Sequence, residues 1–218
     1  MPSPEQVRRA LVLVTTAAVA DTTRLVSASA ARTTAALLAA TPEIVAYYSD
    51  GSAALAADHY DDLRASANAP GRYAAEPIVR LREDKIRIGT MWAVEPLNRP
   101  EPDRLLALSR LADVVQLEAA RPFRDTITTN TRRDPASVGW QRISAGGCKL
   151  CSMLASRGAV YKQATAHFAT HPSCKCSAAP VFDGQPGEEA SVMQYVASER
   201  ERSPAQQQQL RDYLAAMP

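Results

Sequence analysis

The chain is poor in aromatic residues, in histidine and in excess charge of either sign. Aromatic residues make up 6% of the 218 residues, and there are three histidines. Lys and Arg number 25 against 23 Asp and Glu, so the formal net charge is only +2. A general nucleic-acid-binding surface needs a clustered excess of basic residues, and this composition does not indicate one.

The sequence also lacks the motifs of several enzyme classes. It contains no G-x-S-x-G of serine hydrolases, no phosphate-binding loop and no dinucleotide-binding fingerprint. Its apolar content of 46% and charged content of 22% are close to those of ordinary globular proteins, which argues against wholesale disorder. The length suffices for one packed domain, or for a main body with a small satellite.

Long hydrophobic runs are absent as well. The apolar run 10–20 follows Arg8-Arg9 and ends in Ala18-Val19-Ala20, so it resembles a secretory signal. However, Glu5 places an acid in the leader, threonines dilute the run, and eleven residues fall far short of the roughly 20 that cross a bilayer. We interpret the run as a buried helix face, and we expect a soluble intracellular protein without a membrane partner, whose cysteines stay reduced.

The first half of the chain predicts a helical body. Alanine, the best helix former, is abundant over the first seventy residues. Ser3-Pro4-Glu5-Gln6 is typical of a helix start with a capping box, and apolar residues then recur every three or four positions, which predicts one helix over about 4–39. Thr41-Pro42-Glu43 repeats the start pattern and predicts a second helix, which Asp50-Gly51 would break or kink.

The middle of the chain predicts further helices. Residues 76–98 indicate one or two short ones, and Asp103 is expected to cap a helix that runs to about Thr131. Pro122 would kink that helix or split it in two. Its predicted apolar face is broad and consists of Leu105, Leu106, Leu108, Leu111, Val114, Val115 and Leu117.

The character of the chain changes after Asp134-Pro135, where segments become short and glycine-rich. The fold class we expect is mainly α, with a long-helix body at 1–135, a small Cys/His-stapled α+β module at 136–183, and a linker with a C-terminal tail at 184–218. The predicted strands are Trp140–Ile143, Val160–Tyr161 and Ala179–Phe182, and the tail is expected to contain a helix over Pro204–Ala216.

The four cysteines of the chain all lie between positions 148 and 176. Cys148-Lys-Leu-Cys151 is a C-x2-C knuckle, and His171-Pro-Ser-Cys174-Lys-Cys176 follows it after a twenty-residue step. Two such pairs can bring donors to one tetrahedral point with little backbone strain, which predicts a structural zinc ion held by four of these five residues. His167 is a weaker sixth candidate. A module with few large apolar residues needs a staple of this kind.

Three other readings of the cysteines stay open. They could form two disulfides in an oxidising compartment, or they could be unligated buried thiols. Cys148 or Cys174 could also be a nucleophile with His171 as its base, but neighbouring thiols would compete for metal or for one another. We therefore assign no catalytic residue, and lean against an enzyme.

Taken together, these motifs resemble a known family. The quoted runs are Asp134-Pro-Ala-Ser-Val-Gly-Trp140, then Gly147-Cys-Lys-Leu-Cys-Ser-Met-Leu-Ala-Ser-Arg-Gly-Ala-Val-Tyr161, then His171-Pro-Ser-Cys-Lys-Cys176 with Pro180-Val-Phe182. With the upstream stretch Ala54–Arg64, they are similar to the phage Mu F-like minor head proteins of actinobacterial tailed phages. The resemblance covers about 41–183.

The resemblance implies a role in virion assembly. It implies a structural minor head or capsid protein, made in the host cytoplasm and incorporated at the portal or inside the head in a few copies. The implied partners are the portal, the major capsid protein and, less directly, packaged DNA, for which no binding residue can be assigned. Members of this group are often labelled capsid maturation proteases, so a cysteine-dependent maturation protease is the alternative function. Nothing after 183 resembles the appended enzyme domains of some relatives.

Overall fold

The computed structural model describes residues 3–27, 34–146, 148–158, 168, 170–171, 173–182 and 208. Within them the fold is mainly helical, with five α-helices, one 3-10 helix and two strands. The elements are α1 (Pro4–Ser27), α2 (Thr34–Ser66), α3 (Glu83–Val94), η2 (Glu95–Asn98), α4 (Arg104–Arg133), β1 (Gly139–Ile143), α5 (Lys149–Ser156) and β2 (Ser177–Val181). This confirms the predicted fold class.

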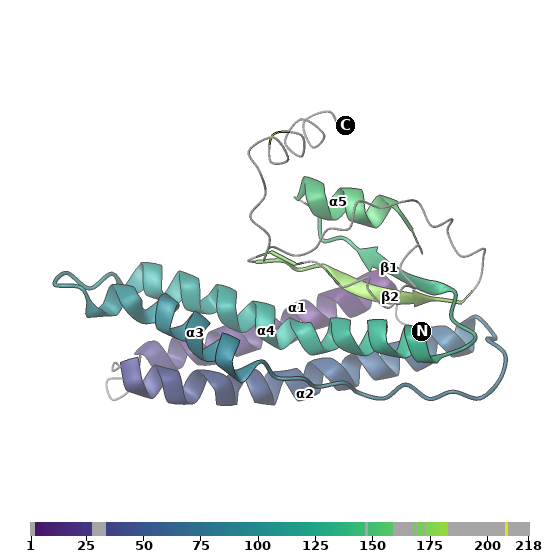
Figure 1. Cartoon of the computed structure of the whole chain (residues 1–218), viewed down its shortest axis with the longest axis horizontal. Helices are drawn as coiled ribbons and strands as arrows, with labels where there is room; N and C mark the ends of the chain where they lie inside the picture. Colours follow the sequence, from purple (N-terminus) through teal and green to yellow (C-terminus); the bar gives the residue numbers. More distant parts are fainter. Residues whose placement is uncertain are drawn as a thin grey trace.

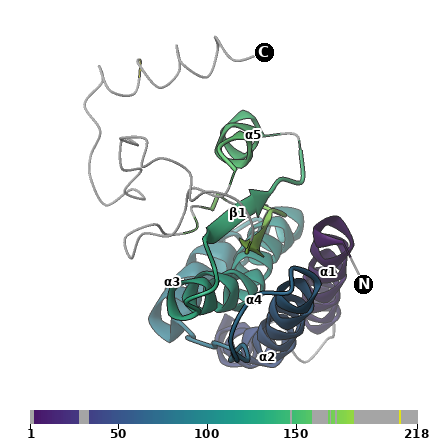
Figure 2. The ribbon, with the colours of Figure 1, turned by 90° about the vertical axis from the view of Figure 1, so that its right-hand side faces the viewer.

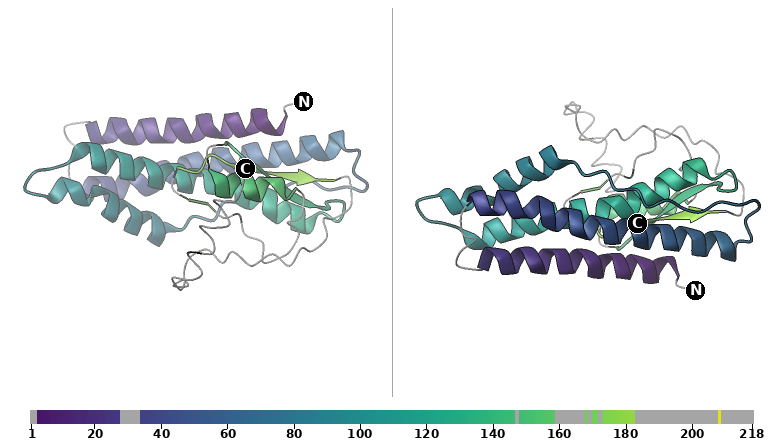
Figure 3. Two further views of the ribbon diagram at one scale, coloured as in Figure 1. Left: turned by 90° about the horizontal axis from the view of Figure 1, so that it is seen from above. Right: turned by 90° about the horizontal axis from the view of Figure 1, so that it is seen from below.

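Three long helices lie side by side and give the molecule its elongated shape (Figure 1). α2 and α4 run in the same direction, α1 runs against them, and α3 packs on α4 beside α2 (Figure 3). The two-stranded sheet lies across one end of this bundle, and α5 lies on the outer side of the sheet (Figure 2). At one end the described fold therefore has three layers, which are the helical bundle, the sheet and α5. The other end consists of helices of the bundle alone.

The core of the bundle is stacked in three sections along its length. Each section takes residues from α1, α2 and α4, so the same three helices touch throughout. At the far end Val26 meets Leu37 and Leu111, and in the middle Ala18 meets Val45. The third section extends under the sheet and consists of Val7, Leu11, Ala56, Tyr60, Ala120, Phe123, Ile127, Trp140 and Ala178. The sheet thus shares a core with the helices, which compensates for its own lack of large apolar residues.

An extended segment at 72–82 joins α2 to α3 and is held by side chains of α4. The amide of Asn130 donates to the carbonyl of Glu76 at 2.9 Å and accepts from the Glu76 N–H at 3.0 Å. Thr126 Oγ1 accepts from the N–H of Ile78 at 2.9 Å. These side chains bond to backbone N–H and C=O groups of an extended segment that belongs to neither strand. This role explains why polar residues are buried in the last turns of α4.

Asp134 fixes the junction between α4 and the sheet. Its carboxylate is fully buried and accepts from Arg64 Nε at 2.9 Å and from the Ala136 N–H at 3.0 Å. Its own N–H makes the last hydrogen bond of the helix, to the carbonyl of Asn130 at 2.8 Å. The backbone of Asp134 is extended, so α4 ends here. Beyond it, β1 and β2 pair antiparallel with Trp140 opposite Pro180, which confirms two predicted strands within a residue or two.

Several helix starts were predicted correctly. Ser3 and Gln6 form the reciprocal capping box, with Ser3 N–H to Gln6 Oε1 at 2.6 Å and Gln6 N–H to Ser3 Oγ at 3.2 Å. Asp103 caps α4 by accepting from the Leu106 N–H at 2.9 Å. The predicted strand Val160–Tyr161 and the tail helix Pro204–Ala216 lie outside the described residues.

The boundary predicted between the first two helices was wrong. An unbroken helix over 4–39 is excluded, because α1 ends at Ser27 and residues 34–39 already belong to α2, which runs the opposite way. α2 then continues through Thr41-Pro42 and through Asp50-Gly51. Thr41 does not cap a new helix, because its hydroxyl donates to the carbonyl of Leu37 at 2.7 Å.

Pro122 does not split α4 in two, and Leu105 does not belong to its buried face. α4 passes through Pro122 as one helix, because the packing of its buried face outweighs the single hydrogen bond that proline removes. Leu105 was placed on the apolar face but is 81% exposed, whereas Leu111 and Val115 are buried as expected.

α1 is long and apolar enough to cross a membrane by length and composition alone, and it is the one such helix among the described residues. Core helices and N-terminal signal sequences meet the same criterion. In this fold α1 buries a stripe that faces α2 and α4, composed of Val7, Leu11, Thr15, Ala18, Thr22 and Val26. This packing agrees with the interpretation of the apolar run 10–20 as a buried helix face.

The continuity of α2 predicts that Gly51→Ala stabilises the protein. Gly51 lies on the exposed side of the helix, and a Cβ there would have no heavy atom within 4 Å. Alanine should raise the free energy of unfolding by about 0.5–1 kcal/mol, measured by urea denaturation. The matched control is Gly71→Ala, at a φ of +74°, which should lower it by about 1 kcal/mol. A destabilised Gly51→Ala variant would contradict an unbroken α2.

His59 predicts an acid-sensitive core. It is buried in α2, and its Nδ1 has no hydrogen-bond partner among the residues that the structure describes. Burial lowers its pKa from 6.5 to about 4, against a smaller opposing effect of Asp62. Because the unfolded chain binds the proton more readily, stability is complete above about pH 6.5 and falls as the pH drops towards 4, by about 2–3 kcal/mol. Denaturation curves of His59→Gln should show a shallower fall over this window; identical pH dependence would exclude His59 as the cause.

Candidate metal centre

The C-x2-C knuckle is built at the start of α5. Cys148 is the residue before the helix, where its backbone is extended, and Cys151 lies in the first turn. Gly146, just upstream, has a φ of +77°, a left-handed conformation that glycine adopts without cost. The reversal of the chain at this glycine brings both sulfurs to the N-terminal end of α5, where the helix dipole favours negative charge.

The second group of donors comes from the segment that leads into β2. A turn at Ser173, with a φ of +59°, lets the Cys174 N–H bond to the carbonyl of His171 at 3.1 Å. Cys174 and Cys176 are two apart on extended backbone, so both side chains fall on the same side. Both are buried, at 3% and 2% exposure.

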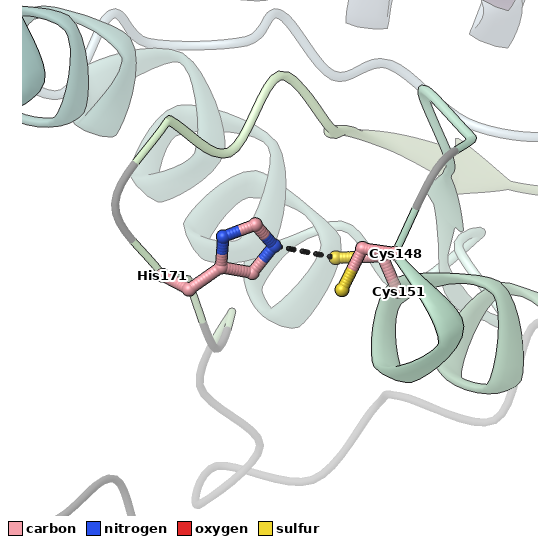
Figure 4. Close-up of side chains that lie close together, drawn as sticks. All are labelled: Cys148, Cys151 and His171. Atoms are coloured by element: carbon pink, nitrogen blue, oxygen red, sulfur yellow. Dashed lines mark hydrogen bonds between the residues drawn. The ribbon is translucent and has the colours of Figure 1, made fainter. Parts of the chain in front are cut away.

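The five predicted donors converge on one place. The sulfurs of Cys151, Cys174 and Cys176 lie within 4.8 Å of one another, and so do the donor atoms of Cys148, Cys151 and His171. Cys151 belongs to both groups, and its Sγ lies 3.3 Å from His171 Nε2 (Figure 4). All four cysteines are free thiols. The sequence spacing that predicted a metal site therefore corresponds to donor atoms that lie close together in the fold. His167 lies outside the described residues.

Burial and mutual repulsion oppose full ionisation of these thiols. Burial raises the pKa of Cys151 to about 12, and the neighbouring Cys176 adds to the shift. Hydrogen bonding between Cys174 and Cys176 lowers the pKa of Cys176 and raises that of Cys174. These shifts disfavour the thiolates of Cys151 and Cys174 and favour that of Cys176. A bound divalent ion would displace the remaining protons, so binding would weaken as the pH falls.

The surroundings of the sulfurs donate hydrogen bonds and positive charge. The N–H of Ala145 lies 3.5 Å from Cys176 Sγ, and Arg142 Nη1 lies 3.8 Å from Cys151 Sγ. Arg124 of α4 donates to the carbonyl of Cys176 at 3.0 Å and to that of Cys174 at 2.9 Å. Amide and cation donors to sulfur are the outer contacts that support thiolate ligands of a metal.

These observations fit a structural metal ion better than they fit a reactive thiol. Sulfur and imidazole donors in this number suit zinc, and the cluster contains more than the four ligands that a closed tetrahedral shell needs. A nucleophilic cysteine needs an accessible side chain with a lowered pKa. Cys151, which contacts His171, is 2% exposed and its pKa is raised. The cluster can therefore hold a metal ion.

Three residues at the site were missed by sequence reasoning: Arg124, Arg142 and Phe168. Both guanidinium groups lie over the Phe168 ring, at 5.1 and 3.8 Å from its centroid, and the ring stacks on Trp140 at 5.5 Å. A cue was present, because Arg142 takes the same side of β1 as the buried Trp140. Arg124 likewise takes a core position of α4, next to Phe123.

Comparison with known proteins gives one match. Residues 3–201 match the family described as VG15 protein, so the match covers the helical bundle, the sheet and the metal centre. No curated protein matches the chain. No solved structure matches it either.

The convergence of the donors predicts about one zinc ion per chain, measured by elemental analysis of protein purified without chelator. Cys176→Ser should lower the zinc content, because it removes one of the three buried sulfurs that lie within 4.8 Å of one another. Ser152→Ala is the matched control, since Ser152 follows Cys151 on α5, is exposed and contributes no donor to the cluster. Zinc content that is unchanged in Cys176→Ser would exclude this cluster as the site.

Proposed function

Because the chain belongs to the VG15 protein family, a viral family of phage genes, we propose that it is a structural minor head protein of a tailed bacteriophage that acts in virion assembly. In this proposal it is of the Mu F-like kind, is made in the host cytoplasm, and is incorporated in a few copies at the portal or on the inner side of the capsid. The portal and the major capsid protein are its proposed partners, and packaged DNA is a further one.

The observation that carries the proposal is the closed character of the Cys/His cluster. Its three central sulfurs are buried, and its donors are numerous enough to fill a tetrahedral shell without substrate or water. A site of this kind stabilises a fold and leaves no position for catalysis. We propose that the ion is zinc, because thiolate ligands, with or without an imidazole, favour it over magnesium or calcium, which prefer oxygen ligands.

The exposed apolar side chains support a role in assembly. Ile88, Met91 and Trp92 lie on one face of α3 and are 65%, 58% and 52% exposed. The guanidinium of Arg110 lies over the ring of Trp92, 4.5 Å from its centroid. Grouped exposed apolar residues favour contact with another protein. In this proposal they face a neighbouring subunit of the head.

A cysteine-dependent capsid maturation protease is the second candidate, and one contact favours it. Cys151 Sγ and His171 Nε2 are 3.3 Å apart, which is within reach of a nucleophile and base. The raised pKa and the burial of Cys151 argue against it, and so do three further thiols within 4.8 Å of its sulfur. We therefore place the structural function first.

Complementation of a phage that lacks this gene would separate the two functions. We expect the wild-type chain in purified heads, in a fixed number of copies by quantitative mass spectrometry, with capsid proteins of unchanged mass. Cys151→Ser should lose zinc and fail to enter heads, because the layer beneath α5 is no longer held. Ser152→Ala should assemble normally, because its side chain lies outside the cluster.

A protease would give the opposite pattern. Cys151→Ser would then fold and enter the heads, and the major capsid protein or a scaffold would keep its unprocessed mass. Absence of the wild-type chain from purified heads, together with normal head yields without the gene, would exclude the structural function.

A further inference from the structure

Arg124 is a fully buried cation that projects from the helical bundle into the metal centre. Its side chain is 2% exposed and lies under the loop that carries Cys174 and Cys176. Nε and Nη2 donate to the carbonyls of these two residues, while Nη1 has no hydrogen-bond partner within the described part of the chain. A buried charge is costly unless an opposite charge compensates it, and carbonyl groups supply only partial negative charge.

A second buried guanidinium contacts the same aromatic ring. Arg142 is 4% exposed, and the guanidinium carbons of Arg142 and Arg124 lie 3.8 and 5.1 Å from the centroid of the Phe168 ring. Burial lowers the pKa of Arg124 and the positive charge of Arg142 adds to this, while Cys174, Cys176 and Asp125 oppose the shift. Two like charges are thus held close together out of water, beside a cluster of cysteine sulfurs.

We infer that Arg124 and Arg142 are the counter-charges of a four-sulfur metal site formed by Cys148, Cys151, Cys174 and Cys176. This inference rests on the proposed metal site and names its ligands. A divalent ion with four thiolates carries a net charge of minus two, equal and opposite to the charge of the two guanidinium groups, whereas three thiolates and one imidazole give minus one. His171 then lies outside the shell and donates its Nε2–H to the sulfur of Cys151, 3.3 Å away.

The ligand set is tested by loading the full chain with Co²⁺ in place of zinc and recording its absorption spectrum. The wild type should show the intense thiolate charge-transfer bands of a four-sulfur site. His171→Gln should keep this spectrum and the metal stoichiometry, whereas Cys148→Ser should change both. A spectrum that is altered by His171→Gln and kept by Cys148→Ser would overturn the four-sulfur assignment.

The counter-charges are tested by zinc affinity in competition with a chromophoric chelator. Arg124→Gln should weaken binding by about 10- to 100-fold, the range for outer contacts of a metal site, while Arg124→Lys, which keeps the charge, should lose far less. Arg121→Gln is the matched control, one turn away on α4 and paired with Asp125 at 3.1 Å, and should bind as the wild type does. Arg142→Gln provides a second neutral variant should Arg124→Gln not fold.

The possible failures are distinguishable. A wild-type chain that takes up neither zinc nor Co²⁺ would remove the metal site itself, and the counter-charges with it. A wild-type chain that binds zinc, with equal affinity losses for Arg124→Gln and Arg124→Lys, would overturn the charge argument alone and leave the metal site in place.

Discussion

The contact between Arg124 and the loop that carries Cys174 and Cys176 is the one on which the described fold depends most. Here the helical bundle and the sheet layer meet through polar groups, because α4 supplies the guanidinium and the loop before β2 supplies the carbonyls. The same loop carries the sulfurs that converge with those of α5. A bound ion, the counter-charges and the bundle would therefore form one connected unit, so that loss of the ion loosens the attachment of the sheet as well as the cluster itself.

The bundle gives the sheet layer a firm base because its helices approach one another closely. Ala18, Ala53, Ala56 and Ala119 are completely buried, and Ser52 Oγ donates to the carbonyl of Ala119 at 2.6 Å between α2 and α4. Small residues at the contacts give a stiff body with few large side chains to anchor it. Two ion pairs lie at the edges of the bundle, Arg64 with Asp134 and Arg82 with Glu118. They fix the ends of segments that apolar packing alone would leave without a unique position.

The function proposed for this chain follows from the way the two parts differ. The helical part exposes apolar side chains on α3, where a partner subunit could bind. The Cys/His part is closed, and its donors face one another instead of a cavity. A head protein that must survive packing between other subunits gains from such a staple, since metal binding to the folded state adds directly to its stability. A protease would need the reverse, an accessible thiol in an open site.

Local features of the fold could be predicted from the sequence, whereas long-range features could not. The capping box at Ser3, the cap at Asp103, the strand at Trp140 and the donor spacing around Cys148 and His171 depend on neighbouring residues, so the sequence determined them. The reversal between α1 and α2, the passage of α2 through Pro42 and the burial of Arg124 depend on which surfaces meet. Packing against another helix can outweigh a proline, and an arginine can enter a core only where folding brings sulfur and carbonyl groups to it. Those outcomes were set by the tertiary structure.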